Sequence, residues 1–278
     1  MGHKELKVII IKTPNSDRYL PIVKVLANNE KFNVVILEAT ILNNYSELFT
    51  KEIEYDTEKF LFFEGRELLP REIGCAASHN DARKIISKEI AGGVILEDDA
   101  RIVDSEIFYR ISIDFLKTNI GKSTILNLTG FRHSSTLRKS TRKDQNLKVT
   151  RIFGEGDLAV AYAITPEAAY NLYKSNFPIS WVADWPSSST KFFVPLYPPV
   201  LHGDDLSGSI ILDGKKEFRY GLTTFDKLRF LSFYIYFRGK SEKITLISYI
   251  KRVYIARLAW RLNSLIIRTQ IFLQDLFL

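Results

Sequence analysis

A short apolar run that ends in three consecutive carboxylates constrains this chain more than any other feature. Residues 93–96 read Gly-Val-Ile-Leu, and Glu97, Asp98 and Asp99 follow directly. A short apolar run after a glycine pair has the length and composition of a buried strand. In open α/β sheets, ligands bind outside the carboxyl ends of the strands. The sequence therefore predicts a buried strand whose acidic tip lies at a ligand-binding edge.

Strand-like and helix-like segments alternate through the first 200 residues. The expected strands are 6–11, 33–37, 94–96, 124–128, 158–165 and 192–196, and the expected helices are 19–27, 70–90, 105–117 and 166–173. Alternation of this kind builds a mostly parallel sheet that is flanked by helices. We therefore predict an α/β fold.

The composition is typical of a globular protein. Hydrophobic residues make up 46% and aromatic residues 13%, which is enough for a packed core. The single cysteine, Cys75, excludes an intramolecular disulfide and fits a reducing compartment. We recognise no secretory signal at the N-terminus, and we expect a cytoplasmic location.

The basic charge is concentrated at the C-terminus. Residues 215–278 hold 13 Lys/Arg and 4 Asp/Glu, a net charge of +9, whereas the whole chain carries +7. Such a segment, rich in large aliphatic and aromatic residues, predicts a basic helix that lies on an anionic membrane surface. Its charges recur too often for a transmembrane span. The alternative is a helix that packs on the protein or forms a homodimer interface. We expect a catalytic domain over 1–225 and a helical tail over 226–278.

Two segments of the chain, residues 97–99 and 132–148, have alternative interpretations, one of which involves an anionic ligand. Closely spaced carboxylates suit a hard cation such as Mg²⁺ or Mn²⁺, which can hold the phosphates of a nucleotide. The alternative is that residues 97–99 are an acidic loop that caps the next helix. Residues 132–148 are strongly basic and polar, and they form either a surface connector or a lid over an anionic ligand. We expect no nucleic-acid binding, because no recognised module is present.

Further motifs lie on both sides of the acidic triplet. Residues 72–79 read Glu-Ile-Gly-Cys-Ala-Ala-Ser-His, residues 162–165 read Tyr-Ala-Ile-Thr, residues 181–185 read Trp-Val-Ala-Asp-Trp, and residues 197–200 read Tyr-Pro-Pro-Val. In this order and spacing they resemble glycosyltransferase family 25, which includes lipooligosaccharide galactosyl- and glucosyltransferases of Gram-negative bacteria. The resemblance spans roughly residues 6–212. The chain departs from the family at residues 12–15 and 156–162.

The resemblance implies a GT-A-like fold, which is a Rossmann-type sheet with a D-x-D-like motif that holds a divalent metal. Glu97, Asp98 and Asp99 fill this motif here. The resemblance implies direct metal contact by Asp99, a contact of Glu97 with the ribose or with the metal and its water, and an additional metal ligand at His202. Asp204 and Asp205 are alternatives to His202. The residues expected to bind the donor are Thr13, Arg18, Ser78, His79, Glu97 and Asp98.

Asp184 is the candidate general base. It lies between Trp181 and Trp185, and a carboxylate beside rings that stack on a sugar can deprotonate the acceptor hydroxyl. The resemblance places the family's late aspartate at Asp184. The alternative is an Asp184 that caps a helix beginning at Pro186, with both tryptophans in the core.

Cys75 and His79 are separated by one helical turn, and a Cys/His nucleophile pair is conceivable. No orienting third group is apparent in the sequence. The favoured interpretation is therefore a packed cysteine and a histidine that helps to bind the nucleotide.

The resemblance therefore implies a metal-dependent inverting hexosyltransferase, with galactose from UDP-galactose as the expected donor and Mn²⁺ or Mg²⁺ as the cofactor. This activity corresponds to a β-galactosyltransferase. The expected partners are a UDP-hexose, a lipooligosaccharide-type glycolipid and the inner face of the bacterial inner membrane. The rival hypothesis is a basic membrane-surface binding protein whose glycosyltransferase-like fold is not catalytic.

Overall fold

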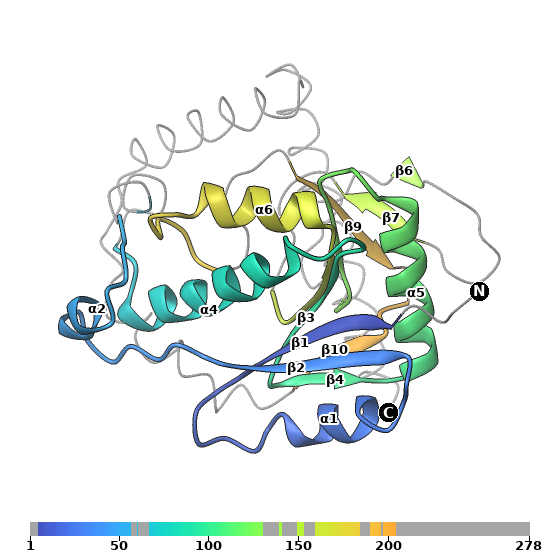
Figure 1. Cartoon of the computed structure of the whole chain (residues 1–278), viewed down its shortest axis with the longest axis horizontal. Coiled ribbons are helices and arrows are strands. Elements are labelled where there is room, and N and C mark those ends of the chain that lie inside the picture. The colour runs from blue at the N-terminus through green and yellow to red at the C-terminus, as the bar shows by residue number, and fades with distance from the viewer. Residues whose placement is uncertain are drawn as a thin grey trace, which may run out of the picture.

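The computed structural model describes residues 5–56, 60, 67–129, 139–140, 149–152, 159–183, 190–195 and 197–203. Their main strands are β1 (Leu6–Lys12), β2 (Phe32–Glu38), β3 (Gly93–Glu97), β5 (Thr124–Asn127), β6 (Lys139–Ser140), β7 (Val149–Ile152), β8 (Ala161–Ile164) and β9 (Lys191–Pro195). These strands form one sheet in the order β2-β1-β3-β8-β5-β9-β7-β6 (Figure 1). A separate pair consists of β4 (Ala100–Ile102) and β10 (Val200–His202).

The main sheet is mostly parallel, as the alternating pattern predicts. Strand β1 runs parallel to both β2 and β3, and β5 runs parallel to β9. Strand β8 is antiparallel to β3 and β5, and β7 is antiparallel to β9 and β6. Within the described residues, every strand of this sheet except β7 and β8 therefore points in the same direction.

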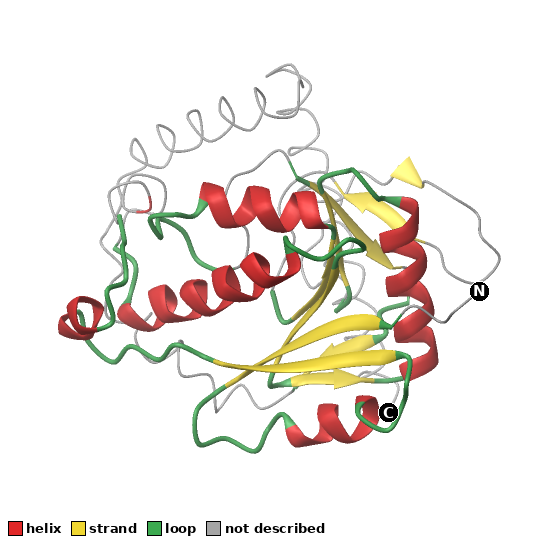
Figure 2. Cartoon of the chain, viewed as in Figure 1, coloured by secondary structure: helices red, strands yellow, loops and turns green. Residues whose placement is uncertain are grey.

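Helices cover both faces of the sheet. They are α1 (Leu20–Leu26), α4 (Pro70–Ile86), α5 (Ser105–Thr118) and α6 (Pro166–Ser175), and Figure 2 shows them around the strands. Helix α2 (Ser46–Thr50) lies away from the sheet and packs near the first half of α4. Along β1, Val8 and Ile10 pack with α1 and α5, whereas Ile9 and Ile11 pack with α4 and α6. Both faces are thus buried, which explains the continuous apolar runs in the sequence.

The helix boundaries follow local signals. Pro166 is the first residue of α6, and Thr165 caps that helix by accepting a hydrogen bond from the Ala168 amide at 3.4 Å. Helix α4 ends at Ile86 and not at residue 90. The residues that follow form the turn into β3, which Gly92 completes with a φ of 81°.

A smaller core surrounds the first half of α4. Gly74 lies so close to Thr40, the second residue after β2, that an added Cβ would meet the Thr40 carbonyl oxygen at 2.5 Å. Trp181 belongs to this core, and its ring stands edge-on to that of Phe60 with the centroids 5.2 Å apart. Trp181 therefore packs in the core, as the alternative interpretation in the sequence analysis expected for this residue.

Several predictions concern segments that the structure does not describe. Asp184, Trp185, most of the stretch 132–148 and the whole tail 226–278 lie outside the described residues. The domain division at residue 225 therefore stays a prediction. Within the ranges given above, no helix combines the length and the apolar character that crossing a membrane requires.

Candidate active site

The three carboxylates lie where the sequence predicts, at the carboxyl end of a central strand. Glu97 is the last residue of β3, and Asp98 and Asp99 form the turn into β4. Strand β1 runs beside β3 with Ile11 opposite Glu97, so the carboxyl ends of both strands meet at one edge. The Thr13 amide, just after β1, donates a hydrogen bond to Asp98 Oδ2 at 3.1 Å. This edge corresponds to the ligand-binding edge of an open α/β sheet.

Two cationic or basic side chains converge on Asp99 Oδ2 from distant parts of the chain. Arg18 Nη2 lies 3.1 Å from this oxygen and 3.9 Å from Asp98 Oδ1. His202 Nε2 lies 3.4 Å from the same oxygen, because β10 pairs with β4 and sets His202 opposite Ala100. The structure thus brings Thr13, Arg18 and His202 to the acidic turn.

Burial and mutual repulsion raise the pKa values of two of these carboxyl groups. Burial, followed by the charge of Asp98, raises the pKa of Glu97 to about 7. Burial, followed by the charge of Glu97, raises the pKa of Asp99 to about 6. Arg18 and His202 lower both pKa values without cancelling the rise. The turn therefore favours additional positive charge.

Two partnerless donor atoms at this turn are candidate ligands for a divalent cation. Among the described residues, Asp99 Oδ1 and His202 Nδ1 are buried without a hydrogen-bond partner. Buried polar atoms are nearly always satisfied, and exceptions call for an explanation such as an ion. Carboxylate and imidazole ligands suit Mn²⁺, and a nucleotide's phosphates can complete its coordination shell. Asp99, His202 and Glu97 are the residues that would hold such an ion.

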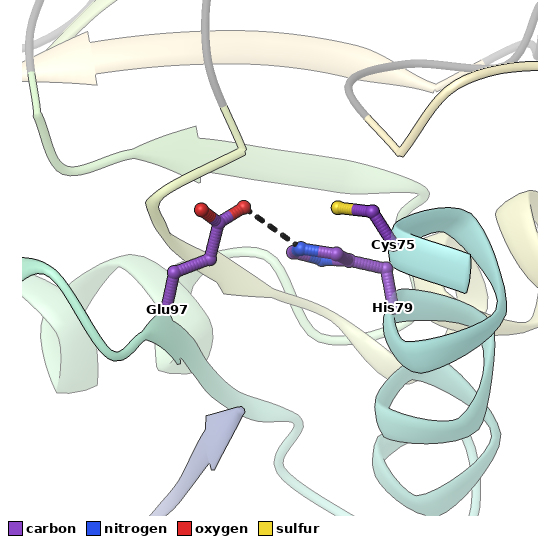
Figure 3. Close-up of side chains that lie close together, drawn as sticks. All are labelled: Cys75, His79 and Glu97. Atoms are coloured by element: carbon purple, nitrogen blue, oxygen red, sulfur yellow. Dashed lines mark hydrogen bonds and ion pairs between the residues drawn. The ribbon is translucent and has the colours of Figure 1, made fainter. Parts of the chain in front are cut away.

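His79 is held from both sides beneath this turn. Its side chain is almost fully buried, with Nε2 3.0 Å from Glu97 Oε1 and Nδ1 3.0 Å from the Tyr162 hydroxyl. Figure 3 shows His79 and Cys75 projecting from α4 toward Glu97. Because both ring nitrogens have partners, neither is left to take the proton of the Cys75 thiol. This arrangement does not support a Cys/His nucleophile pair.

Ser78 contributes to the packing of α4. Its hydroxyl donates to the Gly74 carbonyl at 2.9 Å and accepts from the Thr40 amide at 2.8 Å. The first bond lies within α4, and the second ties α4 to the residues after β2. A contact of Ser78 with the donor stays a prediction.

Two buried residues, Arg83 and Tyr162, have no role in the predictions from sequence, although Tyr162 begins one of the motifs quoted there. Arg83 is fully buried, and its guanidinium donates to the Ala183 carbonyl at 2.6 Å and lies 5.8 Å from the centre of the Tyr162 ring. Tyr162 is the partner of His79 described above. Arg83 follows His79 by one helical turn, so the spacing of the buried face of α4 could have indicated its position.

A comparison with known families matches most of the chain that carries these residues. A sequence profile of glycosyltransferase family 25, described as LPS biosynthesis protein, matches residues 7–185. The match spans more than half of the 278 residues and includes the motif at 72–79, the acidic triplet and Asp184. It ends before His202, whose place in the site rests on the β4–β10 pairing. A search of curated proteins gave no match.

The pKa of Asp99 generates a prediction about stability. The folded state holds a proton on Asp99 up to about pH 6, whereas the carboxyl group ordinarily has a pKa of 3.8, so wild-type stability falls as pH rises through this window. Asp99→Asn has no carboxyl group at this position, so its unfolding free energy does not fall in this way as pH rises. Relative to wild type, the variant should gain about 2 kcal/mol between pH 4 and pH 8, since the pKa rises from 3.8 to about 6, one pKa unit corresponds to about 1.4 kcal/mol, and a small part of the loss has already occurred at pH 4.

The measurement is urea denaturation of both proteins at pH 4 and pH 8, with a chelator present to remove divalent ions. A difference in unfolding free energy that does not change with pH would contradict the assignment.

Proposed function

We propose, because this chain belongs to glycosyltransferase family 25, that it transfers a hexose from a nucleoside diphosphate sugar to a lipopolysaccharide-type glycolipid. Family membership makes it a glycosyltransferase of lipopolysaccharide biosynthesis, with a nucleotide-sugar donor and an acceptor. The finer proposal is an inverting, Mn²⁺- or Mg²⁺-dependent transfer of galactose from UDP-galactose.

The observation that carries the proposal is the acidic turn with Arg18 and His202 around Asp99. A nucleoside diphosphate gains negative charge as the bond to the sugar breaks. Arg18 keeps 41% of its side chain exposed, so its guanidinium can contact a phosphate as well as Asp99. A bound divalent ion would stabilise the leaving diphosphate as a Lewis acid. Asp99 and His202, with Glu97 beside them, supply the ligand atoms.

The reaction needs one base on the acceptor side. In an inverting transfer, the acceptor hydroxyl oxygen attacks the anomeric carbon, and the bond from that carbon to the phosphate oxygen breaks. The diphosphate leaves with the bonding electrons, and the hydroxyl proton passes to the base. We assign this base to Asp184. In support, the preceding residue is fixed, because Arg83 holds the Ala183 carbonyl.

Replacing Asp99 tests the metal assignment. Asp99→Asn removes a charged ligand and should abolish release of UDP from UDP-galactose in the presence of Mn²⁺. Asp114→Asn, at an exposed carboxylate on α5, is the matched control and should keep wild-type activity. Full activity of Asp99→Asn, or unchanged turnover in excess EDTA, would refute metal dependence. No donor turnover by wild type with any nucleotide sugar would favour the rival, non-catalytic membrane-surface protein.

Replacing Asp184 tests the base. Asp184→Asn should lower kcat by about 100-fold or more, which is the usual contribution of a general base, and should leave the KM for the donor unchanged. Steady-state kinetics with saturating acceptor measures both constants. A variant that loses UDP binding but keeps kcat would assign Asp184 to the donor site.

The basic tail leads us to propose a peripheral location at the cytoplasmic face of the inner membrane. Each Lys or Arg near an anionic surface contributes about 1 kcal/mol. The chain should therefore bind anionic liposomes, and salt should weaken this binding. Deletion of residues 243–278 should lower the turnover of a lipid-linked acceptor more than the turnover of a soluble acceptor. Flotation of liposomes with full-length and truncated protein measures this. A folded truncation that binds as before would overturn the proposal, and an unfolded one would assign the tail to the core or to an oligomer interface.

A further inference from the structure

Three donor atoms of different chemistry converge just behind the acidic turn. Cys75 and His79 lie four residues apart on α4, so both side chains project from the same face of the helix. Glu97 reaches them from the end of β3, as Figure 3 shows. The sulfur, a ring nitrogen and a carboxylate oxygen of these residues all lie within 4.8 Å of one another.

We propose that Cys75, His79 and Glu97 form a second metal site, which takes a borderline-soft divalent cation such as Zn²⁺. Thiolate, imidazole and carboxylate are the ligands that Zn²⁺ combines in proteins, and three of them leave a fourth position open. Mg²⁺ and Mn²⁺ prefer oxygen ligands. The sulfur of Cys75 therefore distinguishes this site from the carboxylate-rich site at Asp99.

The surroundings of His79 are those of a metal ligand. A histidine that binds a metal through one ring nitrogen usually donates the N–H of the other nitrogen to a fixed acceptor. The Tyr162 hydroxyl is 3.0 Å from Nδ1 and can serve as that acceptor. Tyr162 is itself fully buried, with the Arg83 guanidinium over its ring. Nε2 is thus directed at Glu97 Oε1, 3.0 Å away.

The geometry requires only small side-chain movements. Zinc bonds of about 2.3 Å to sulfur and about 2.0 Å to nitrogen or oxygen set neighbouring ligand atoms roughly 3.5 Å apart in a tetrahedral site. The three atoms here lie within 4.8 Å of one another. Side-chain rotations of Cys75 and Glu97 that move their ligand atoms by about an ångström would therefore bring all three to these spacings. Cys75 and Glu97 are partly exposed, with 29% of the Glu97 side chain accessible to solvent, so both can rotate. Only 1% of the His79 side chain is exposed, and its position is fixed. Binding would release the thiol proton and the proton shared by Nε2 and Oε1.

Occupancy of this site has a consequence for catalysis, which rests on the proposed function. Glu97 belongs to both the zinc site and the acidic turn. A cation held by Cys75 and His79 would draw the Glu97 carboxylate away from the nucleotide side. Zn²⁺ should therefore inhibit Mn²⁺-supported transfer, and Cys75→Ser should relieve that inhibition.

The direct test is Co²⁺ binding to the reduced, chelator-treated full-length chain. The chain has one cysteine, so a thiolate-to-cobalt charge-transfer absorption can arise only from Cys75. Wild type should show this band, and Zn²⁺ should displace it. Cys75→Ser should lose the band, and His79→Gln and Glu97→Gln should each weaken Co²⁺ binding at least tenfold. Tyr162→Phe should weaken it by about tenfold, as is usual for a group that orients a ligand.

Asp99→Asn is the matched control, because it removes a carboxylate of the neighbouring site and should leave the band unchanged. The proposal is overturned if wild type shows no band, if both His79→Gln and Glu97→Gln leave it intact, or if Asp99→Asn abolishes it. Far-UV circular dichroism checks the fold of each variant, and Glu97→Gln carries the test if His79→Gln does not fold. Failure of donor turnover would leave the cobalt result unaffected, so the two proposals fail separately.

Discussion

Repulsion among three carboxylates at the end of one central strand is the constraint on which the rest of the site depends. Water cannot fully screen these charges, since Asp98 is buried and Asp99 keeps only 17% of its side chain exposed. The chain compensates with one guanidinium, one imidazole and one backbone amide, from Arg18, His202 and Thr13. These partners come from segments after β1 and in β10, so the compensation also joins distant parts of the chain.

The sheet makes this concentration of charge tolerable because it fixes the strand that bears it. Strand β3 lies between a parallel β1 and an antiparallel β8, and the Glu97 amide donates to the Val160 carbonyl at 2.8 Å. Behind the strand, α4 supplies His79 against the Glu97 carboxylate. Because β1, β8 and α4 fix the end of β3, the turn keeps its like charges close together, whereas a mobile loop would let them separate. A binding edge for cations gains preorganisation from this rigidity.

Local sequence patterns predicted which segments are helices or strands and where the acidic edge lies, because burial of β1 and β3 on both faces produces continuous apolar runs in the sequence. These patterns did not predict which strands pair with one another. The insertion of the antiparallel β8 between β3 and β5 depends on long-range pairing. The contact between His79 and Tyr162 likewise joins residues 83 positions apart. From the sequence alone, Arg83 would be predicted to be solvated. Its burial is explained by long-range partners, the Ala183 carbonyl and the Tyr162 ring.

The short β4–β10 pair has a mechanical consequence. The Gly203 amide donates to the Asp99 carbonyl at 2.9 Å, and Gly203 is the last residue that the structure describes. The 75 residues that follow are therefore tethered at the acidic turn itself and not at a remote edge of the fold. A displacement of Gly203 is therefore passed through this hydrogen bond to the backbone of Asp99, which couples the position of β10 to the geometry of the acidic turn.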